Sequence, residues 1–269
     1  MSESNSIGPS GGNSLSQEMA GGVLWLTLNR PDRKNALNWE MLSGLLTAIE
    51  GASADDSIRT IVITGGVGET FCSGVDLSKM GGGDDFLEAH NSRGGLVRLF
   101  RAMWECPRPI VAEVDGYALA GGFGLASACD IIVSSDQAHF GLPEVGVGVW
   151  PFIISVPLLR VASPRFVLEM MMTGRRIDAA EALAKGFVNF VYPRSSLREE
   201  VRKLTENLAS RSLATLALGK GSFYNLLSGG SQLELGYLHS MLGLINQTED
   251  AHEGIEAFLN RRPPAWKDR

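Results

Sequence analysis

The stretch 110–135 constrains the fold of this chain more than any other part of the sequence, because a glycine pair separates two apolar runs in it. Residues 110–114 form an apolar, β-prone run, which predicts a buried strand. After Gly121 and Gly122, small apolar residues recur at helical spacing, and residues 131–133 form a second β-prone run. The order strand, glycine turn, helix, strand is typical of a layered α/β fold.

A glycine pair at a helix start leaves backbone N–H groups that no side chain covers, and the first N–H groups of a helix have no partner within it. Gly121 and Gly122 are therefore a candidate site for a developing negative charge. Close packing of the helix on its neighbours is the alternative explanation. A dinucleotide-binding fingerprint would need Gly or Ala where Ser127 stands, and a P-loop would need a following Lys and Ser or Thr.

The length of 269 residues suits one large domain, or one domain with a small appendage. A hydrophobic share of 44% and a charged share of 20% are ordinary for a globular protein. The formal net charge of −6 argues against a nucleic-acid surface, which needs a basic face, but it leaves room for an anionic ligand. Since no apolar run reaches the length of a membrane span, we expect neither a nucleic-acid nor a membrane partner.

Cys72, Cys106 and Cys129 form an odd set without a CxxC motif or a metal-ligand spacing. We interpret them as reduced packing residues and expect a cytoplasmic protein with no metal. Cys72 lies in a predicted turn and is the candidate for a thiol nucleophile, although no histidine motif accompanies it. Residues 1–16 lack the charged start and apolar run of a signal peptide, and their Ser, Gly and Asn content predicts a disordered tail.

The first part of the chain alternates strand and helix signals. Residues 23–29 and 58–64 are β-prone, and Asn38 is a preferred capping residue for the helix between them. The apolar stripe of that helix consists of Met41, Leu42, Leu45, Leu46 and Ile49. A second helix is predicted before Pro107, with an apolar face formed by Leu96, Leu99, Phe100 and Met103.

Capping signals mark the helices of the second half. Helix starts are predicted at Ser163, Asp178, Ser196 and Asp250, the last three because a Glu follows three residues later. The final strand signal covers residues 187–192. We therefore expect a mixed core of residues 17–208 and a helical region of residues 209–269 that mediates assembly.

A second glycine turn precedes the central stretch. It contains Ser73, Gly74, Val75 and Asp76, and the glycine-rich segment 81–85 follows. Glycine lets the chain turn sharply, which leaves the N–H of Val75 available as a donor. An ordinary turn is the alternative.

Several motifs, in this order along the chain, resemble those of the crotonase superfamily, also called the enoyl-CoA hydratase/isomerase family. The resemblance runs from about Leu24 to Ala257. The matching stretches are residues 28–31, 35–37, 71–77, 116–122, 129–132, 140–144 and 254–259.

The resemblance implies a spiral of ββα units with a C-terminal helical trimerisation region, in which trimers often pair into hexamers. It also implies an acyl-CoA thioester of fatty acid metabolism as the ligand. Coenzyme A is then part of the substrate, and no separate cofactor is expected.

In the family, two backbone N–H groups hold the thioester oxygen, and their positions match Val75 and Gly121. Preorganised donors of this kind stabilise an enolate oxygen by roughly 3 kcal/mol each. The resemblance places coenzyme A against Arg33, Lys34, Ala36, Ser73, Asp76 and Leu77, with Lys79 and Arg262 as phosphate contacts. A solvated face is the alternative for the charged residues.

Family hydratases use two glutamates, of which the second matches Glu144. The first should stand where this sequence has Gly124, and glycine can neither bind nor ionise water. Glu113 and Asp115 match no catalytic position of the family. A site with Glu144 as its one glutamate resembles that of family Δ3,Δ2-enoyl-CoA isomerases, in which one glutamate moves a proton from C2 to C4.

The run 145–152 is apolar, so it should raise the pKa of Glu144 toward neutrality. A salt-bridged loop carboxylate is the alternative for Glu144. Trp150 and Phe152, with Gly124, are expected in the acyl pocket or in the core, and His139 is expected to be structural.

The sequence thus favours an enoyl-CoA isomerase that works through Glu144. An enoyl-CoA hydratase, another crotonase reaction and a catalytically weak acyl-CoA-binding protein stay open as alternatives.

Overall fold

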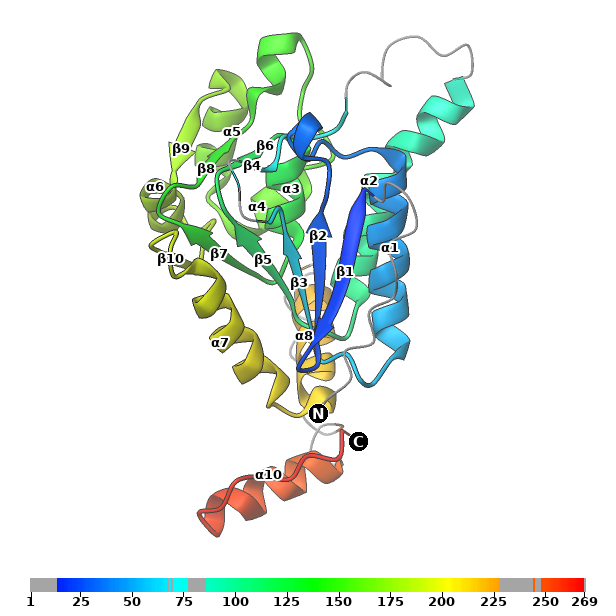
Figure 1. The fold of residues 1–269 in the computed structure, drawn as a ribbon, viewed down its shortest axis with the longest axis vertical. Helices are drawn as coiled ribbons and strands as arrows, with labels where there is room; N and C mark the ends of the chain where they lie inside the picture. The colour runs from blue at the N-terminus through cyan, green and yellow to red at the C-terminus, as the bar shows by residue number, and fades with distance from the viewer. Residues whose placement is uncertain are drawn as a thin grey trace.

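The computed structural model of the chain describes residues 14–66, 68, 70–76, 86–227, 244 and 248–268. Strands and helices alternate within them and form two sheets (Figure 1). The expectations for Leu77, Lys79, residues 1–13 and residues 81–85 lie outside this part of the chain. Among its helices, none has the length and apolar character needed to cross a membrane.

The larger sheet has the strand order β1-β2-β3-β5-β7-β10. A hairpin of β1 (Leu15–Ala20) and β2 (Val23–Leu28) forms one edge, and the next strands add in parallel. They are β3 (Thr60–Thr64), β5 (Ile110–Val114), β7 (Ile131–Ser135) and β10 (Phe190–Tyr192). Because β3 and β5 are buried on both faces, their sequences are nearly continuous apolar runs rather than alternating ones.

The smaller sheet contains four strands of three residues. β4 (Thr70–Cys72), β6 (Tyr117–Leu119) and β8 (His139–Gly141) are parallel, and β9 (Arg176–Asp178) is antiparallel to β8. Three times, a strand of the larger sheet is followed by a strand of the smaller sheet and then by a helix. This repetition confirms the expected spiral of ββα units.

Helices cover both faces of the larger sheet (Figure 1). Apolar residues of α1 (Trp39–Ala54), α2 (Phe86–Glu105) and α3 (Gly121–Ala128) belong to the main core, and those of α7 (Leu197–Ala209) pack on the other face. The remaining helices are α4 (Ser155–Val161), α5 (Pro164–Thr173), α6 (Ala179–Ala184), α8 (Leu213–Leu226) and α10 (Glu249–Leu259).

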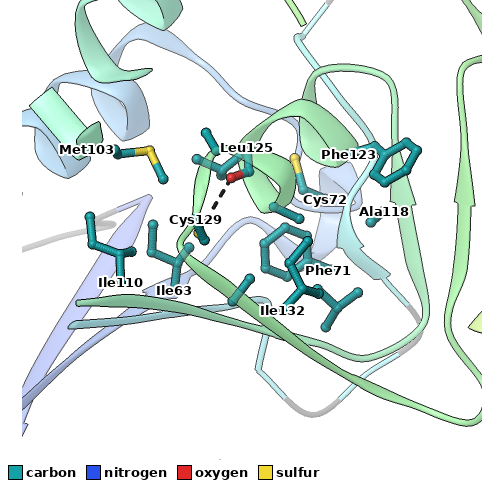
Figure 2. Packing of buried hydrophobic residues seen from close by; sticks show 14 of the residues in the cluster. Ile63, Phe71, Cys72, Met103, Ile110, Ala118, Phe123, Leu125, Cys129 and Ile132 are labelled. Atoms are coloured by element: carbon teal, nitrogen blue, oxygen red, sulfur yellow. Dashed lines mark hydrogen bonds between the residues drawn. The ribbon is translucent and has the colours of Figure 1, made fainter. Parts of the chain in front are cut away.

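The centre of the core is α3, every residue of which is buried. Figure 2 shows Phe71 and Cys72 of β4 beside Phe123 and Leu125 of α3. The Cys129 thiol donates to the Leu125 carbonyl oxygen over 3.5 Å.

The three cysteines are free and buried, as the sequence predicted. Burial raises the pKa of the Cys72 thiol to about 12, although backbone hydrogen bonds to Gly74 and Leu37 oppose the shift. A buried thiol that keeps its proton is no nucleophile, which excludes the alternative reading of Cys72.

Local signals predicted several helix boundaries correctly. The Asn38 side chain accepts a hydrogen bond from Met41 N at 2.9 Å and caps α1. Gly174 ends α5 in the left-handed region with φ of +67°. The Asp178 side chain caps α6 by accepting from Glu181 N at 2.8 Å.

Other expectations are wrong. Residues 15 and 16 do not belong to a disordered tail, because β1 begins at Leu15, which is buried in the core. Ser196 precedes α7 as expected, but its side chain makes no capping hydrogen bond, because the hydroxyl group donates to the Pro193 carbonyl oxygen instead.

Two further differences from the expectations concern the start of α10 and the short strands. The start of α10 is capped by Thr248, which accepts from Ala251 N, whereas Asp250 accepts from Ser212, Lys267 and Asp268. The strands β4, β6 and β9 escaped sequence analysis, because three residues are too few to show a period of two.

The contact between α3 and β4 requires a glycine at position 122. A methyl group there would lie 2.7 Å from Cys72 Cβ and closer still to the Cys72 carbonyl oxygen. We expect Gly122→Ala to lower the free energy of unfolding by about 3 kcal/mol, because backbone cannot move aside without separating the two elements. Urea unfolding measures this loss.

The control is Gly51→Ala, at an exposed helical glycine with nothing within 4 Å of an added methyl group. It should leave stability unchanged or raise it by up to about 1 kcal/mol. Equal effects of the two substitutions would contradict the close contact.

Candidate active site

Two backbone turns meet where α3 begins. A methyl group at Gly74 would lie 2.8 Å from Ala120 Cβ and 3.3 Å from Gly121 N. One at Gly121 would lie 3.3 Å from Val75 N. Gly74 also has φ of +109°, which favours glycine. The structure therefore brings Val75 and Gly121 together from positions 46 residues apart, as the sequence predicted.

The N–H of Val75 points away from its strand neighbour. Leu37 forms a parallel bridge with Val75, in which Leu37 N donates to Gly74 O at 2.7 Å and Asp76 N donates to Leu37 O at 2.9 Å. In such a bridge the flanking groups make the hydrogen bonds, so the Val75 N–H faces the opposite side.

The second N–H belongs to Gly121, the first residue of α3, which has no acceptor within the helix. Neither Val75 N nor Gly121 N has an acceptor among the described residues. Ala120, directly before the helix, has φ of +51° and ψ of −128°, a conformation that costs free energy in a residue with a side chain. The two donors, at the positive end of α3, suit an oxygen that gains negative charge.

The segment before Leu37 is fastened to the same turn. Ser73 N donates to Lys34 O at 3.0 Å, which sets residues 34–37 alongside residues 73–76. Arg33 and Lys34 are exposed, and Ala36 is partly exposed. The expected contacts Arg33, Lys34, Ala36, Ser73 and Asp76 therefore form one cluster beside Val75.

Asn35 holds this segment, a role that the residues next to it in the sequence do not indicate. Asn35 is buried, with φ of +53°, a left-handed conformation that Asn tolerates better than most residues. Its side chain accepts from Arg30 N at 2.9 Å and donates to Gly65 O and Thr70 O. The resemblance had marked Asn35 as matching, but its hydrogen-bond partners are distant in sequence.

Glu144 lies three residues after β8, in the short 3-10 helix η3 (Pro143–Val147). Its Oε2 atom is buried and has no hydrogen-bond partner in the described part of the chain. Burial raises the pKa of Glu144, a shift that a hydrogen bond from its own backbone N–H opposes. This is the predicted direction, and no ion pair is present to support the salt-bridge alternative among the described residues.

The place of the missing glutamate is occupied. A methyl group at Gly124 would lie 2.6 Å from Cβ of Ile154, and closer still to its Cγ2 atom. Ile154 is buried and precedes α4, which packs against α3. Ile154 fills this space from 30 residues further along the chain, and no local pattern in the sequence predicts that contact.

Other acidic side chains near α3 are committed elsewhere. Glu113 pairs with Arg198 at 2.9 Å. Asp115 accepts from Arg194 and Ser135. Asp130 accepts from Lys220, Tyr224 and Ile110. These carboxylates hold α7 and α8 to the sheet rather than replace the missing acid.

The two aromatic residues expected in the substrate pocket, Trp150 and Phe152, lie in different surroundings. Trp150 packs against the main core, whereas Phe152 is 74% exposed. The side chain of Phe152 thus lies at the surface of the single chain, and its expected place in the substrate pocket stays a prediction. His139 stacks on Tyr117 with ring centroids 5.2 Å apart, which agrees with a structural role.

Arg262 is also separate from the cluster. Its guanidinium group donates to both carboxylate oxygens of Glu253, at 2.5 and 2.9 Å. It follows α10, which lies at the end of the molecule opposite β4 and β6 (Figure 1). Within one chain, Arg262 therefore lies apart from this cluster, and its expected contact with coenzyme A stays a prediction.

Comparisons with known proteins agree with this geometry. Residues 18–269 match the family model described as enoyl-CoA hydratase/isomerase. The chain is 37% identical to a putative enoyl-CoA hydratase of Thermus thermophilus, over 91% of this chain and 98% of that protein. It is 35% identical to 2,3-dehydroadipyl-CoA hydratase of Escherichia coli, over 92% and 96% of the two chains.

Solved structures give the same result. The crystal structure of an enoyl-CoA hydratase of Mycobacterium smegmatis superimposes with a TM-score of 0.90 at 30% identity. The superposition covers 94% of this chain and 98% of that one.

The buried carboxyl group of Glu144 should make stability depend on pH. Since its pKa is raised in the folded protein, the unfolded chain loses the proton at lower pH, and ionisation favours unfolding as pH rises above the ordinary value of 4.5. We expect Glu144→Gln to gain stability relative to the parent protein across that window and to gain none below it.

Urea midpoints measured over a pH series test this expectation. Glu18→Gln, at an exposed position of β1, is the control and should show no such trend. A Glu144→Gln difference that does not change with pH would contradict the effect of burial.

Proposed function

Because the chain belongs to the enoyl-CoA hydratase/isomerase family, we propose that it shifts the double bond of an enoyl-CoA from Δ3 to Δ2, with Glu144 as the acid–base group. The observation that carries this proposal is the occupation of position 124. A hydratase of this family needs an acid there, and here Gly124 is packed against Ile154.

The proposed reaction needs one carboxylate. Glu144 takes a proton from C2 of the 3-enoyl thioester, and the electron pair moves onto the thioester oxygen as an enolate. The same carboxyl group then returns the proton to C4, so that the double bond moves and no water is consumed. The raised pKa of Glu144 supports this role, because a group that titrates nearer neutrality both accepts and donates a proton readily.

The enolate oxygen is proposed to bind the N–H groups of Val75 and Gly121, each worth roughly 3 kcal/mol in the transition state. Coenzyme A would lie against Arg33, Lys34, Ala36 and Ser73. These residues supply positive charge and backbone groups beside the two donors.

Hydration is the second candidate function. The relatives named above are called hydratases, and their names favour water addition. In this chain it would need a group other than residue 124 to bind the water. A catalytically weak acyl-CoA-binding protein is the remaining alternative, since the backbone donors do not depend on the missing acid.

A homotrimer or hexamer is part of the proposal. Large apolar side chains on η3, α5 and α10 are exposed in the single chain, among them Val147, Met172 and Leu259 at 64%, 62% and 72%. Apolar surface of this kind supports a partner subunit. A cytoplasmic location is proposed on the three free thiols alone.

A paired assay with a 3-enoyl-CoA and a 2-enoyl-CoA distinguishes the candidates. We expect double-bond migration without comparable hydration, and Glu144→Gln should lower kcat for migration about 1000-fold while binding of coenzyme A persists. Hydration at a similar rate would overturn the isomerase, and silence with both thioesters would favour the binding protein.

Restoring the acid alone should not create a hydratase. Gly124→Glu places the new side chain against Ile154, so we expect loss of stability and no gain in hydration. The double variant Gly124→Glu with Ile154→Gly removes that obstacle and should recover stability relative to the single variant. Efficient hydration by Gly124→Glu alone would show that Ile154 does not block the position.

A further inference from the structure

Arg30 joins the two segments that flank the candidate oxyanion hole. Its Nη2 atom donates to Asp76 Oδ2 at 2.9 Å, and its Nη1 atom donates to the Ala36 carbonyl oxygen at 2.5 Å. The side chains of Arg30 and Asp76 are 18% and 14% exposed. At this burial an ion pair is screened less than one at the surface and holds a defined geometry.

Both contacts of Arg30 lie one residue from the bridged pair Leu37 and Val75. Ala36 precedes Leu37 and Asp76 follows Val75, so the guanidinium group clamps the bridge from both strands. The bridge itself is a single isolated pair with two hydrogen bonds. So short a pairing is marginal without outside support, and Arg30 supplies that support.

The backbone beside the bridge is under strain that a clamp must hold. Lys34 and Asn35 have φ of +51° and +53°, both in the left-handed region. Asn35 also binds Arg30 N, Gly65 O and Thr70 O, so the segment keeps other anchors when the Arg30 side chain is removed. Loss of the clamp should therefore loosen the turn rather than unfold the chain.

We propose that Arg30 is a positioning residue for the oxyanion hole: through Asp76 and the Ala36 carbonyl group it fixes the direction of the Val75 N–H. Asp76 is then part of this clamp rather than a contact of coenzyme A. The proposal rests on the proposed function, in which that N–H binds the thioester oxygen. An N–H that points away from the oxygen contributes little, because hydrogen bonds weaken steeply with angle.

The planar guanidinium group suits this task, because it reaches two acceptors from fixed directions. An ammonium group lacks that fork. Arg30→Lys should therefore restore only part of the function that Arg30→Met loses, although it keeps the charge.

The direct test is infrared difference spectroscopy of bound butyryl-CoA labelled with ¹³C at the thioester carbonyl. This saturated probe does not react, and its carbonyl band moves to lower frequency when hydrogen bonds polarise it. In the parent protein we expect that shift. In Arg30→Met and in Asp76→Asn we expect a smaller shift, with binding of the probe retained.

The control is Arg59→Met, which breaks the Arg59–Asp268 ion pair. The side chains of that pair are 23% and 25% exposed, similar to those of Arg30 and Asp76. Asp268 also donates a hydrogen bond to Asp250 of α10, so this ion pair lies at the α10 end of the molecule. Arg59→Met should therefore keep the full shift of the carbonyl band. A parent-like shift in Arg30→Met would overturn the positioning role, and no shift in the parent protein would overturn the oxyanion hole itself.

Kinetics separates positioning from folding. With a 3-enoyl-CoA as the substrate, Arg30→Met should lower kcat roughly 100-fold with a smaller change in KM. The kcat of Arg30→Lys should lie between those of the parent protein and Arg30→Met. A change confined to KM or to the urea midpoint would contradict the proposal.

Discussion

The close approach of two glycine turns is the constraint on which the rest of this structure depends. Gly74 and Gly121 touch backbone to backbone, and a side chain at either would push the turns apart. Two of the ββα units contribute to this approach, because the glycine turns follow β4 and β6 of the smaller sheet, and β3 and β5 precede these strands in the larger sheet. The left-handed Ala120 shows that strain is tolerated to keep the two N–H groups together.

Around that contact, the acidic side chains differ in their burial and in their hydrogen-bond and ion-pair partners. Glu144 has a buried oxygen without a hydrogen-bond partner and no ion pair among the described residues, whereas Asp115 and Asp130 accept hydrogen bonds and Glu113 faces the guanidinium group of Arg198. A buried carboxyl oxygen without a hydrogen-bond partner destabilises a folded protein, and the proposed function accounts for this cost at Glu144. At position 124, Ile154 fills the space that a side chain would need, which is the observation behind the proposed isomerase.

Local chemistry made much of the fold predictable. Asn38, Asp178 and Gly174 act within one helical turn of their own positions, so their roles follow from the sequence near them. Signals failed where a partner lies outside the local pattern: Asp250 binds the C-terminal segment instead of capping α10, and Leu15 pairs with Leu28 of the neighbouring strand β2. The four strands of the smaller sheet are too short for a pattern and exist only because the larger sheet places them side by side.

The sequence by itself determined the alternation of strands and helices and the positions of the glycine turns, because each depends on residue type and local spacing, whereas the ββα spiral and the identity of the remaining acid came from the family resemblance. The resemblance then assigned Val75, Gly121 and Glu144 to one site. Only the tertiary structure decided that Ile154 fills the space at Gly124, that Arg30 clamps the bridge beside Val75, and that Arg262 lies apart. These three depend on which atoms fold into the same volume, and contacts between residues far apart in sequence leave no mark in a local pattern.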